Sequence, residues 1–214
     1  MNKYIIEFIG TFFLVFTIGN VVVEPGAGAL APVAIGGVLM VMIFAGGHIS
    51  GAHYNPAVTL AVFLRGKCDA KDVGPYVGAQ IAAAAVAAKL VLFLKGPDAA
   101  IQAMDLSAKL PQVILAEILF TFALAFVILN VATAKGTEGN SFYGLAIGFT
   151  VMAGAFAVGG ISGGVFNPAV AVGISMIGLS SWANIWVYLV ANFAGGAIAA
   201  IVFKIVNPAD EGSS

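Results

Sequence analysis

Long uninterrupted blocks of apolar residues are the dominant pattern along this chain. No Asp, Glu, Lys or Arg occurs between Glu24 and Arg65, and none occurs between Glu138 and Lys204. A soluble fold would expose part of such a block to water, whereas a bilayer core of ~30 Å requires it. Six stretches are close to the ~20 residues that a spanning helix needs. They cover about 4–23, 31–48, 73–94, 112–133, 142–159 and 182–205.

Two further apolar stretches are too short to cross a bilayer. They begin at Asn55 and Asn167 and last about ten residues each, so as helices they reach only ~15 Å. Both begin with Asn-Pro, and asparagine is a good N-cap while proline is favoured at the first helical position. The glycine-rich segments before them, 46–53 and 159–165, are expected to be irregular backbone that lines a wet cavity. The pattern therefore predicts two half-helices with polar entry loops.

The chain also repeats itself. Glu7 recurs as Glu117 at an offset of 110, and Asn55 recurs as Asn167 at an offset of 112. Other blocks recur at the offset of 112: 34–36 at 146–148, 49–51 at 161–163, and 76–79 at 188–191. Each copy holds three spanning helices, an odd number, so the second copy must enter from the opposite side.

The sequence thus predicts an all-α membrane protein with six transmembrane helices and two re-entrant half-helices. We expect a single channel domain over 1–214, made of two inverted repeats at about 1–96 and 112–206. The basic residues predict its orientation, because the side with more of them faces the cytoplasm. That side holds Lys3, Arg65, Lys67, Lys71, Lys135 and Lys204, and the opposite side holds Lys95 and Lys109. We therefore expect a multi-pass protein of the cell membrane with both termini cytoplasmic.

In an inverted repeat, the two half-helices meet N-terminus to N-terminus near the middle of the bilayer. Each end carries about half a positive charge, and together they oppose a cation at ~4 Å by ~4 kcal/mol at an effective dielectric of ~20. Neutral solutes are unaffected, and the Asn amides can hydrogen-bond them. The predicted pore midplane consists of Asn55, Pro56, Ala57, Asn167, Pro168 and Ala169.

Glu7 and Glu117 are charges inside spanning helices, and such charges face the bundle interior and have partners. We expect them to hold the entry loops by hydrogen bonds, together with His48; the alternative is that they are helix-end charges reaching toward the interface. His48 and His53 have no cysteine or carboxylate cluster beside them, so we expect no metal site. No nucleophile–base pair or phosphate loop is apparent, and the net charge is -1. We therefore expect no enzyme activity, no cofactor and no nucleic-acid partner.

These motifs make the chain similar to the aquaporin, or major intrinsic protein, family. The resemblance is carried by the run Gly47–Thr59, the second Asn-Pro-Ala at 167–169, and the Glu-x-x-x-Thr-Phe starts at Glu7 and Glu117. It implies a homotetramer in the lipid bilayer with one pore per subunit, and passive conduction of water, glycerol or related neutral molecules.

The resemblance also implies a selectivity filter at four positions, Ile35, Ala155, Gly164 and Val170. The family usually has arginine where this chain has Val170, and water-specific members have histidine where it has Ala155. Small apolar groups at both positions predict a ring that is wider and less polar than a water filter, although a narrow apolar ring can also dewet and gate.

Four functions remain open at this point. The first is a facilitator for neutral solutes beyond water, such as glycerol, urea, ammonia or hydrogen peroxide. The others are a mainly water-conducting pore, a structural or adhesive membrane tetramer with a nearly closed pore, and an ion-leak channel.

Overall fold

The computed structural model describes residues 1–208, and within that range the chain forms eight α-helices. Six of them are long and apolar enough to cross a membrane, as predicted. They are α1 (Asn2–Val22), α2 (Ala31–Ser50), α4 (Ala70–Lys95), α5 (Leu110–Thr133), α6 (Tyr143–Ser162) and α8 (Ile185–Val206). The two half-helices are confirmed as α3 (Pro56–Leu64) and α7 (Pro168–Ile177). Single 3-10 turns occur at Gly28–Leu30, Ser107–Lys109, Lys135–Thr137 and Trp182–Asn184.

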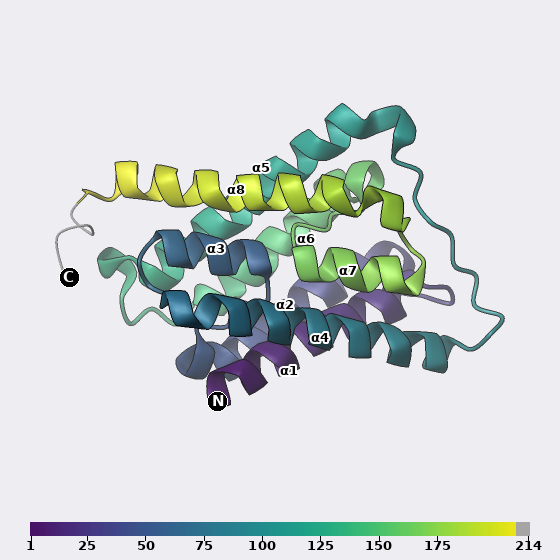
Figure 1. Cartoon of the computed structure of the whole chain (residues 1–214), viewed down its shortest axis with the longest axis horizontal. Coiled ribbons are helices and arrows are strands. Elements are labelled where there is room, and N and C mark those ends of the chain that lie inside the picture. The colour runs from purple at the N-terminus through teal and green to yellow at the C-terminus, as the bar shows by residue number, and fades with distance from the viewer. Residues whose placement is uncertain (209–214) are drawn as a thin grey trace.

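The helices pack in corresponding pairs. In the first half of the chain α1 packs on α4, and in the second half α5 packs on α8. Each half-helix is also held by the other half of the chain, since α3 packs on α8 and α7 packs on α4. Figure 1 shows α3 and α7 lying end to end between the longer helices, with the start of α1 and the end of α8 at the same end of the molecule.

α2 and α6 cross at a pair of glycines that are 112 residues apart in the sequence. A Cβ on Gly36 would lie 2.6 Å from the carbonyl oxygen of Gly148, and a Cβ on Gly148 would lie 2.5 Å from the carbonyl oxygen of Gly36. Only glycine permits two helix backbones to approach this closely, and such small-residue contacts are common between membrane helices.

Two helix ends differ from the sequence-based prediction. The segments 46–50 and 159–162, expected to be irregular, are the last turns of α2 and α6. Both helices instead end at Gly51 and Gly163, whose φ angles of 83° and 90° are left-handed. Glycine is the usual residue for this type of helix end. Among the earlier glycines, Gly46 is closely packed because Tyr54 fills the space beside it, whereas a Cβ on Gly159 or Gly160 would meet nothing within 4 Å.

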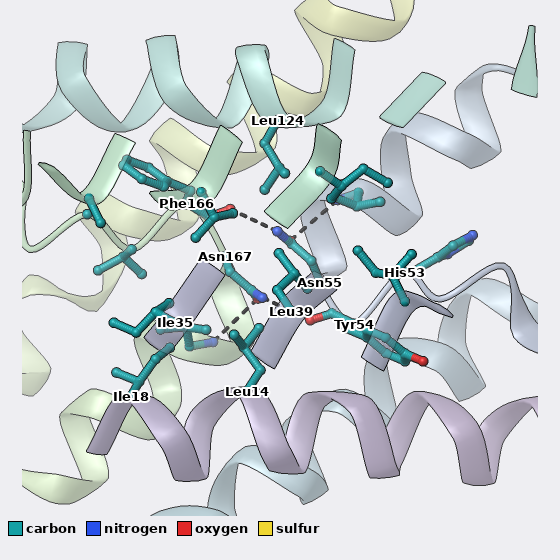
Figure 2. A pocket seen from close by; sticks show the side chains of 18 of the residues that line it. Leu14, Ile18, Ile35, Leu39, His53, Tyr54, Asn55, Leu124, Phe166 and Asn167 are labelled. Atoms are coloured by element: carbon teal, nitrogen blue, oxygen red, sulfur yellow. Dashed lines mark hydrogen bonds between the residues drawn. The ribbon is translucent and has the colours of Figure 1, made fainter. Parts of the chain in front are cut away.

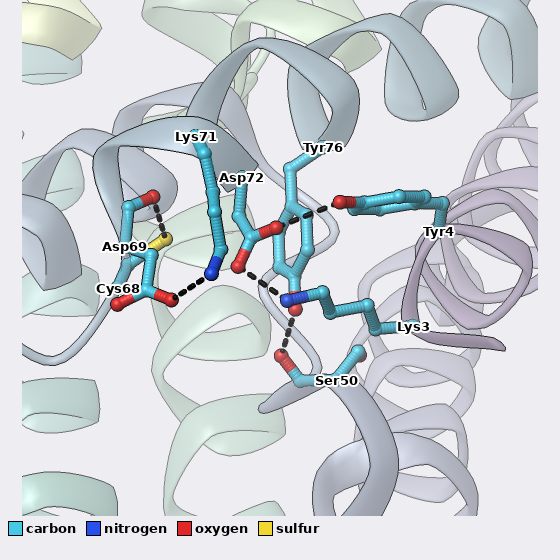
Figure 3. A network of polar contacts seen from close by, with 8 residues as sticks. All are labelled: Lys3, Tyr4, Ser50, Cys68, Asp69, Lys71, Asp72 and Tyr76. Atoms are coloured by element: carbon cyan, nitrogen blue, oxygen red, sulfur yellow. Dashed lines mark hydrogen bonds and ion pairs between the residues drawn. The ribbon is translucent and has the colours of Figure 1, made fainter. Parts of the chain in front are cut away.

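A polar network joins α1, the end of α2 and the first turns of α4 (Figure 3). The Tyr4 hydroxyl donates a hydrogen bond to the Asp72 carboxylate at 2.7 Å, and Lys3 forms an ion pair with the same carboxylate. The Tyr76 hydroxyl donates to the carbonyl of Ser50 at 2.7 Å. The network fixes the point at which the chain leaves α2 for the first half-helix.

Candidate functional site

A cavity runs through the place where α3 and α7 meet (Figure 2). It is lined by residues of α1, α2, α5 and α6 as well as by both half-helices and the segments that precede them. Both asparagines predicted at the midplane line this one cavity, as Asn55 and Asn167. Most of the remaining wall is branched aliphatic: Leu14, Ile18, Ile35, Leu39, Ile43, Leu124, Ile128, Ile147, Val151 and Ile174.

Each asparagine caps its own half-helix. The Asn55 Oδ1 accepts hydrogen bonds from the backbone N–H of Ala57 at 2.8 Å and of Val58 at 3.4 Å. The Asn167 Oδ1 accepts from Ala169 at 2.9 Å and from Val170 at 3.4 Å in the same way. An N-cap oxygen satisfies N–H groups that the first helical turn leaves unpaired. The side-chain oxygens are therefore committed to the protein.

The side-chain nitrogens of the two asparagines cross over to the opposite loop. Asn55 Nδ2 donates to the carbonyl of Phe166 at 2.8 Å, and Asn167 Nδ2 donates to the carbonyl of Tyr54 at 2.8 Å (Figure 2). An amide nitrogen carries two hydrogens, so one N–H of each asparagine remains for a solute. The crossed bonds hold the two helix N-termini against each other, which concentrates their partial positive charges at one point of the cavity.

The entry loop before α3 is held by Glu7. Its Oε1 accepts from the Ser50 hydroxyl at 2.7 Å and from the His53 N–H at 2.9 Å. Its Oε2 accepts from the Tyr54 N–H at 2.7 Å and from the Gln80 side chain at 2.8 Å. Four donors suit the acceptor capacity of an ionised carboxylate. The side chain is completely buried, so it is not a helix-end charge that reaches the interface.

Glu117 holds the second entry loop by the same arrangement. Its Oε1 accepts from the Ser162 hydroxyl at 2.6 Å and from the Val165 N–H at 2.9 Å. Its Oε2 accepts from the Phe166 N–H and from the Asn192 side chain, both at 2.8 Å. These contacts agree with the expectation that both glutamates bind the loops.

Gln80 and Asn192 are supporting residues that the sequence reasoning missed. Besides its glutamate, Gln80 donates to the Thr59 hydroxyl at 3.1 Å, and Asn192 donates to the Thr121 hydroxyl at 3.0 Å. A signal for them was present, because both are amides inside apolar helices and they are 112 residues apart. Each follows directly after one of the recurring blocks that end at Ala79 and Ala191.

His48 was expected to support a loop, and the structure does not place it there. It lies on the exposed surface of α2, and within residues 1–208 no hydrogen bond joins it to either entry loop. The physical reason is the longer α2, which carries position 48 on a helix turn instead of in a loop. The buried His53 is the loop histidine, and its Nδ1 lies 3.2 Å from the Thr59 hydroxyl.

The four predicted filter positions line the same cavity. Figure 2 shows one of them, Ile35, beyond the asparagines on the side of Ile18. Ile35, Ala155 and Gly164 are partly exposed, whereas Val170 is buried. Gly164 has a left-handed φ of 63°, and a Cβ there would lie 3.3 Å from the Cα of Ala155. A larger residue at 164 would therefore meet the backbone of α6. We call this set the first ring: Ile35, Ala155, Gly164 and Val170.

Comparison with known protein families gives a match over nearly the whole chain. The family model described as Major intrinsic protein matches residues 1–203. The chain is 36% identical over 212 residues to the protein named Aquaporin NIP1-4 of Oryza sativa subsp. japonica. This match covers 96% of this chain and 77% of that relative. It is 35% identical to the Glycerol uptake facilitator protein-like 6 of Lactiplantibacillus plantarum, and this match covers 98% of this chain and 100% of that relative.

A solved structure has the same fold. The aquaglyceroporin from Plasmodium falciparum superposes with a TM-score of 0.82, and the match covers 99% of both chains. The two sequences are 23% identical, so this likeness concerns the arrangement of the helices.

Proposed function

This chain belongs to the major intrinsic protein family of membrane channels for small neutral solutes, which are not enzymes, and we propose that it conducts water together with glycerol, urea, ammonia or hydrogen peroxide. The observation that carries the proposal is the pair of crossed asparagines at the centre of one aliphatic cavity. Their two remaining N–H groups offer hydrogen bonds to a neutral solute.

The polarity of the cavity supports passage of neutral molecules over ions. A cation that reaches the asparagines meets two helix N-termini, which oppose it by ~4 kcal/mol if it lies ~4 Å away at an effective dielectric of ~20. That energy corresponds to roughly a thousandfold lower occupancy. A neutral solute has no such electrostatic penalty.

The first ring supports solutes other than water. None of its four side chains is charged, aromatic or a hydrogen-bond donor. Val170 stands where the family usually has arginine, so the ring lacks the fork of donors that a guanidinium would present. The segment 163–166 before α7 lines the cavity. This segment is shorter than the predicted 159–165 because α6 extends to Ser162. Such a ring selects weakly for water.

The proposal includes the assembly and the orientation. The resemblance to the family supports a homotetramer with one pore in each subunit, in which each subunit is one domain of two inverted repeats at about 1–96 and 112–206. The excess of lysine and arginine at the end where α1 begins supports cytoplasmic termini in a cell membrane. Native mass spectrometry in detergent tests the assembly, and a persistent monomer that still conducts would contradict it.

Stopped-flow light scattering on proteoliposomes tests the function. Vesicles with the purified protein are exposed in turn to gradients of an impermeant osmolyte, glycerol and urea. The expected result is faster water flux than in empty vesicles, followed by reswelling in glycerol and urea. Water flux without reswelling would identify a water pore. No flux above empty vesicles would support the structural alternative, and a membrane current carried by salt would support the ion leak.

A further inference from the structure

The cavity has a second ring on the opposite side of the asparagines, related to the first by the sequence repeat. Moving each first-ring position by 112 residues gives the second ring: Ile147 for Ile35, Ile43 for Ala155, Ala52 for Gly164, and Val58 for Val170. All four of these residues line the cavity. The repeat therefore builds two rings, one on each side of the asparagines.

The two rings differ in size. Two pairs are identical residues, isoleucine at 35 and 147 and valine at 58 and 170. In the other two pairs the second ring is larger, because Ile43 replaces an alanine and Ala52 replaces a glycine. The second ring therefore carries four more side-chain carbon atoms around the same path, and close-packed protein interiors respond to a single one.

The two rings also differ in how far their residues are exposed. In the second ring Ile43 is 3% exposed, Ile147 4%, Ala52 6% and Val58 1%. In the first ring three of the four residues are partly exposed. Three residues of the first ring are therefore more accessible than any residue of the second ring, whereas Val170 is as buried as Ile147.

Two residues of the second ring, Ile43 and Ile147, lie at a neck between two cavities. A larger cavity opens at the end where α2 and α5 finish, and it is lined by the loop between α5 and α6 as well as by His48 and Lys67. This vestibule and the central cavity share four lining residues, Ile43, His53, Ile128 and Ile147. Figure 2 shows His53 on the opposite side of the asparagines from Ile18 and Ile35. A solute must pass the neck to reach the vestibule.

We propose that the second ring, and Ile43 above all, sets the upper size of the solutes that this channel conducts. The inference rests on the proposed function, since only a conducting pore has a size limit. The first ring is the more permissive of the two because the small side chain of Ala155 leaves space that Ile43 fills at the corresponding position of the second ring. The limit acts mainly on glycerol and urea, which are larger than water, ammonia and hydrogen peroxide. Aliphatic side chains supply no compensating hydrogen bonds, so a solute also loses part of its hydration there.

The repeat supplies a matched pair of variants for the test. Ile147→Ala and Ile35→Ala make the same change at corresponding positions of the two rings, and Ile43→Ala gives the second ring the alanine of the first. Stopped-flow light scattering then gives the glycerol-to-water permeability ratio of each variant. We expect Ile43→Ala to raise this ratio roughly tenfold, a change of about 1.4 kcal/mol in the barrier. Ile147→Ala should raise it more than Ile35→Ala does.

Two further variants keep the result interpretable. Ile49→Ala removes an isoleucine that is 43% exposed on α2 and does not line the cavity, so the ratio should stay as in the wild type. Ile43→Val is a milder change that preserves packing if Ile43→Ala fails to fold, and it should raise the ratio by a smaller factor.

The outcomes separate this inference from the function on which it rests. A wild-type protein that conducts water and glycerol, with unchanged ratios in folded Ile43→Ala and Ile43→Val, overturns the second ring as the size limit. A larger effect of Ile35→Ala than of Ile147→Ala also overturns it and assigns the limit to the first ring. If the wild type and every variant match empty vesicles for all solutes, the channel function itself fails.

Discussion

At the scale of single residues, the absence of a charge at position 170 is the main chemical feature of the pore. Val170 follows the second Asn-Pro-Ala, lines the cavity and gives its backbone N–H to Asn167. Its side chain offers neither a donor nor a charge to a passing solute. Under the proposed function, discrimination in this pore rests on size and on the two asparagines.

Val170→Arg tests that view. The guanidinium should add hydrogen-bond donors, narrow the first ring and raise a second barrier to cations of ~4 kcal/mol if it lies ~4 Å from their path at a dielectric of ~20. We expect glycerol permeability to fall roughly tenfold and water permeability to fall less, both measured by stopped-flow light scattering. Val170→Met is the uncharged control of similar reach.

An arginine without partners is costly to bury, so folding must be checked by size-exclusion chromatography before the permeabilities are compared. A well-folded Val170→Arg protein with the wild-type glycerol-to-water ratio would show that position 170 takes no part in selection.

The buried glutamates are the second feature at this scale. Glu117→Gln replaces an oxygen acceptor by an amide nitrogen, so at least one of the four donors around it loses its partner. A buried unsatisfied donor costs about 1–3 kcal/mol. We expect a lower thermal unfolding temperature in detergent for this variant, while the exposed control Glu138→Gln should unfold as the wild type does. Equal unfolding temperatures for Glu117→Gln and the wild type would mean that the loop does not depend on this carboxylate.

At the scale of elements, helix starts were easier to predict than helix ends. Asn-Pro at 55–56 and 167–168 marked the starts of α3 and α7 because the cap and the first helical residue are both local preferences. The ends of α2 and α6 depend on tertiary packing. Tyr54 leaves no room for a side chain at Gly46, whereas the left-handed φ falls at Gly51, and a sequence alone does not say which glycine of a cluster will adopt a left-handed φ.

The same distinction applies to the site. The repeat placed Glu7 and Glu117 in equivalent roles, because two identical charges at matching positions in apolar helices need the same kind of partner. It did not reveal that each Asn side-chain nitrogen binds the carbonyl of the opposite loop. These contacts join residues more than 100 positions apart, and only the packed half-helices define them.

The paired half-helices predict exclusion of protons even without an arginine in the first ring. Their N-termini keep their partial charges whatever residue occupies position 170. In vesicles loaded with a pH-sensitive dye, proton flux through the wild-type protein should equal that of empty vesicles while water flux is raised. Proton flux above that background, abolished by a pore blocker, would favour an ion leak.

At the scale of the whole molecule, one repeated unit builds a pathway whose two halves are chemically unequal. The support is nearly symmetric, since both glutamates bind the same kinds of partner at similar distances. The lining is not, because the first ring has Ala155 and Gly164 where the second has Ile43 and Ala52. Because the two glutamates hold the two entry loops alike while the two rings differ in size, one side of the pore sets the size limit without a change of the fold.

The proposed function requires that solutes cross through the cavity inside each chain, and a single cysteine in that cavity tests this route. Cys68 is the only native cysteine, and burial, with Asp72 and Asp69 nearby, raises the pKa of its thiol. A Cys68→Ser background removes it. Ala155→Cys then places one thiol in the first ring, and Val190→Cys places one on α8, where the side chain is 58% exposed and does not line the cavity.

Both variants are labelled with a mercurial in detergent, checked by mass for one label per chain, reconstituted, and measured by stopped-flow light scattering in a glycerol gradient. We expect labelled Ala155→Cys to lose water and glycerol flux to near the level of empty vesicles and to regain both after treatment with a thiol, whereas labelled Val190→Cys should conduct as before. Full flux through fully labelled Ala155→Cys would contradict conduction through this cavity, because the solutes would then be crossing by another route.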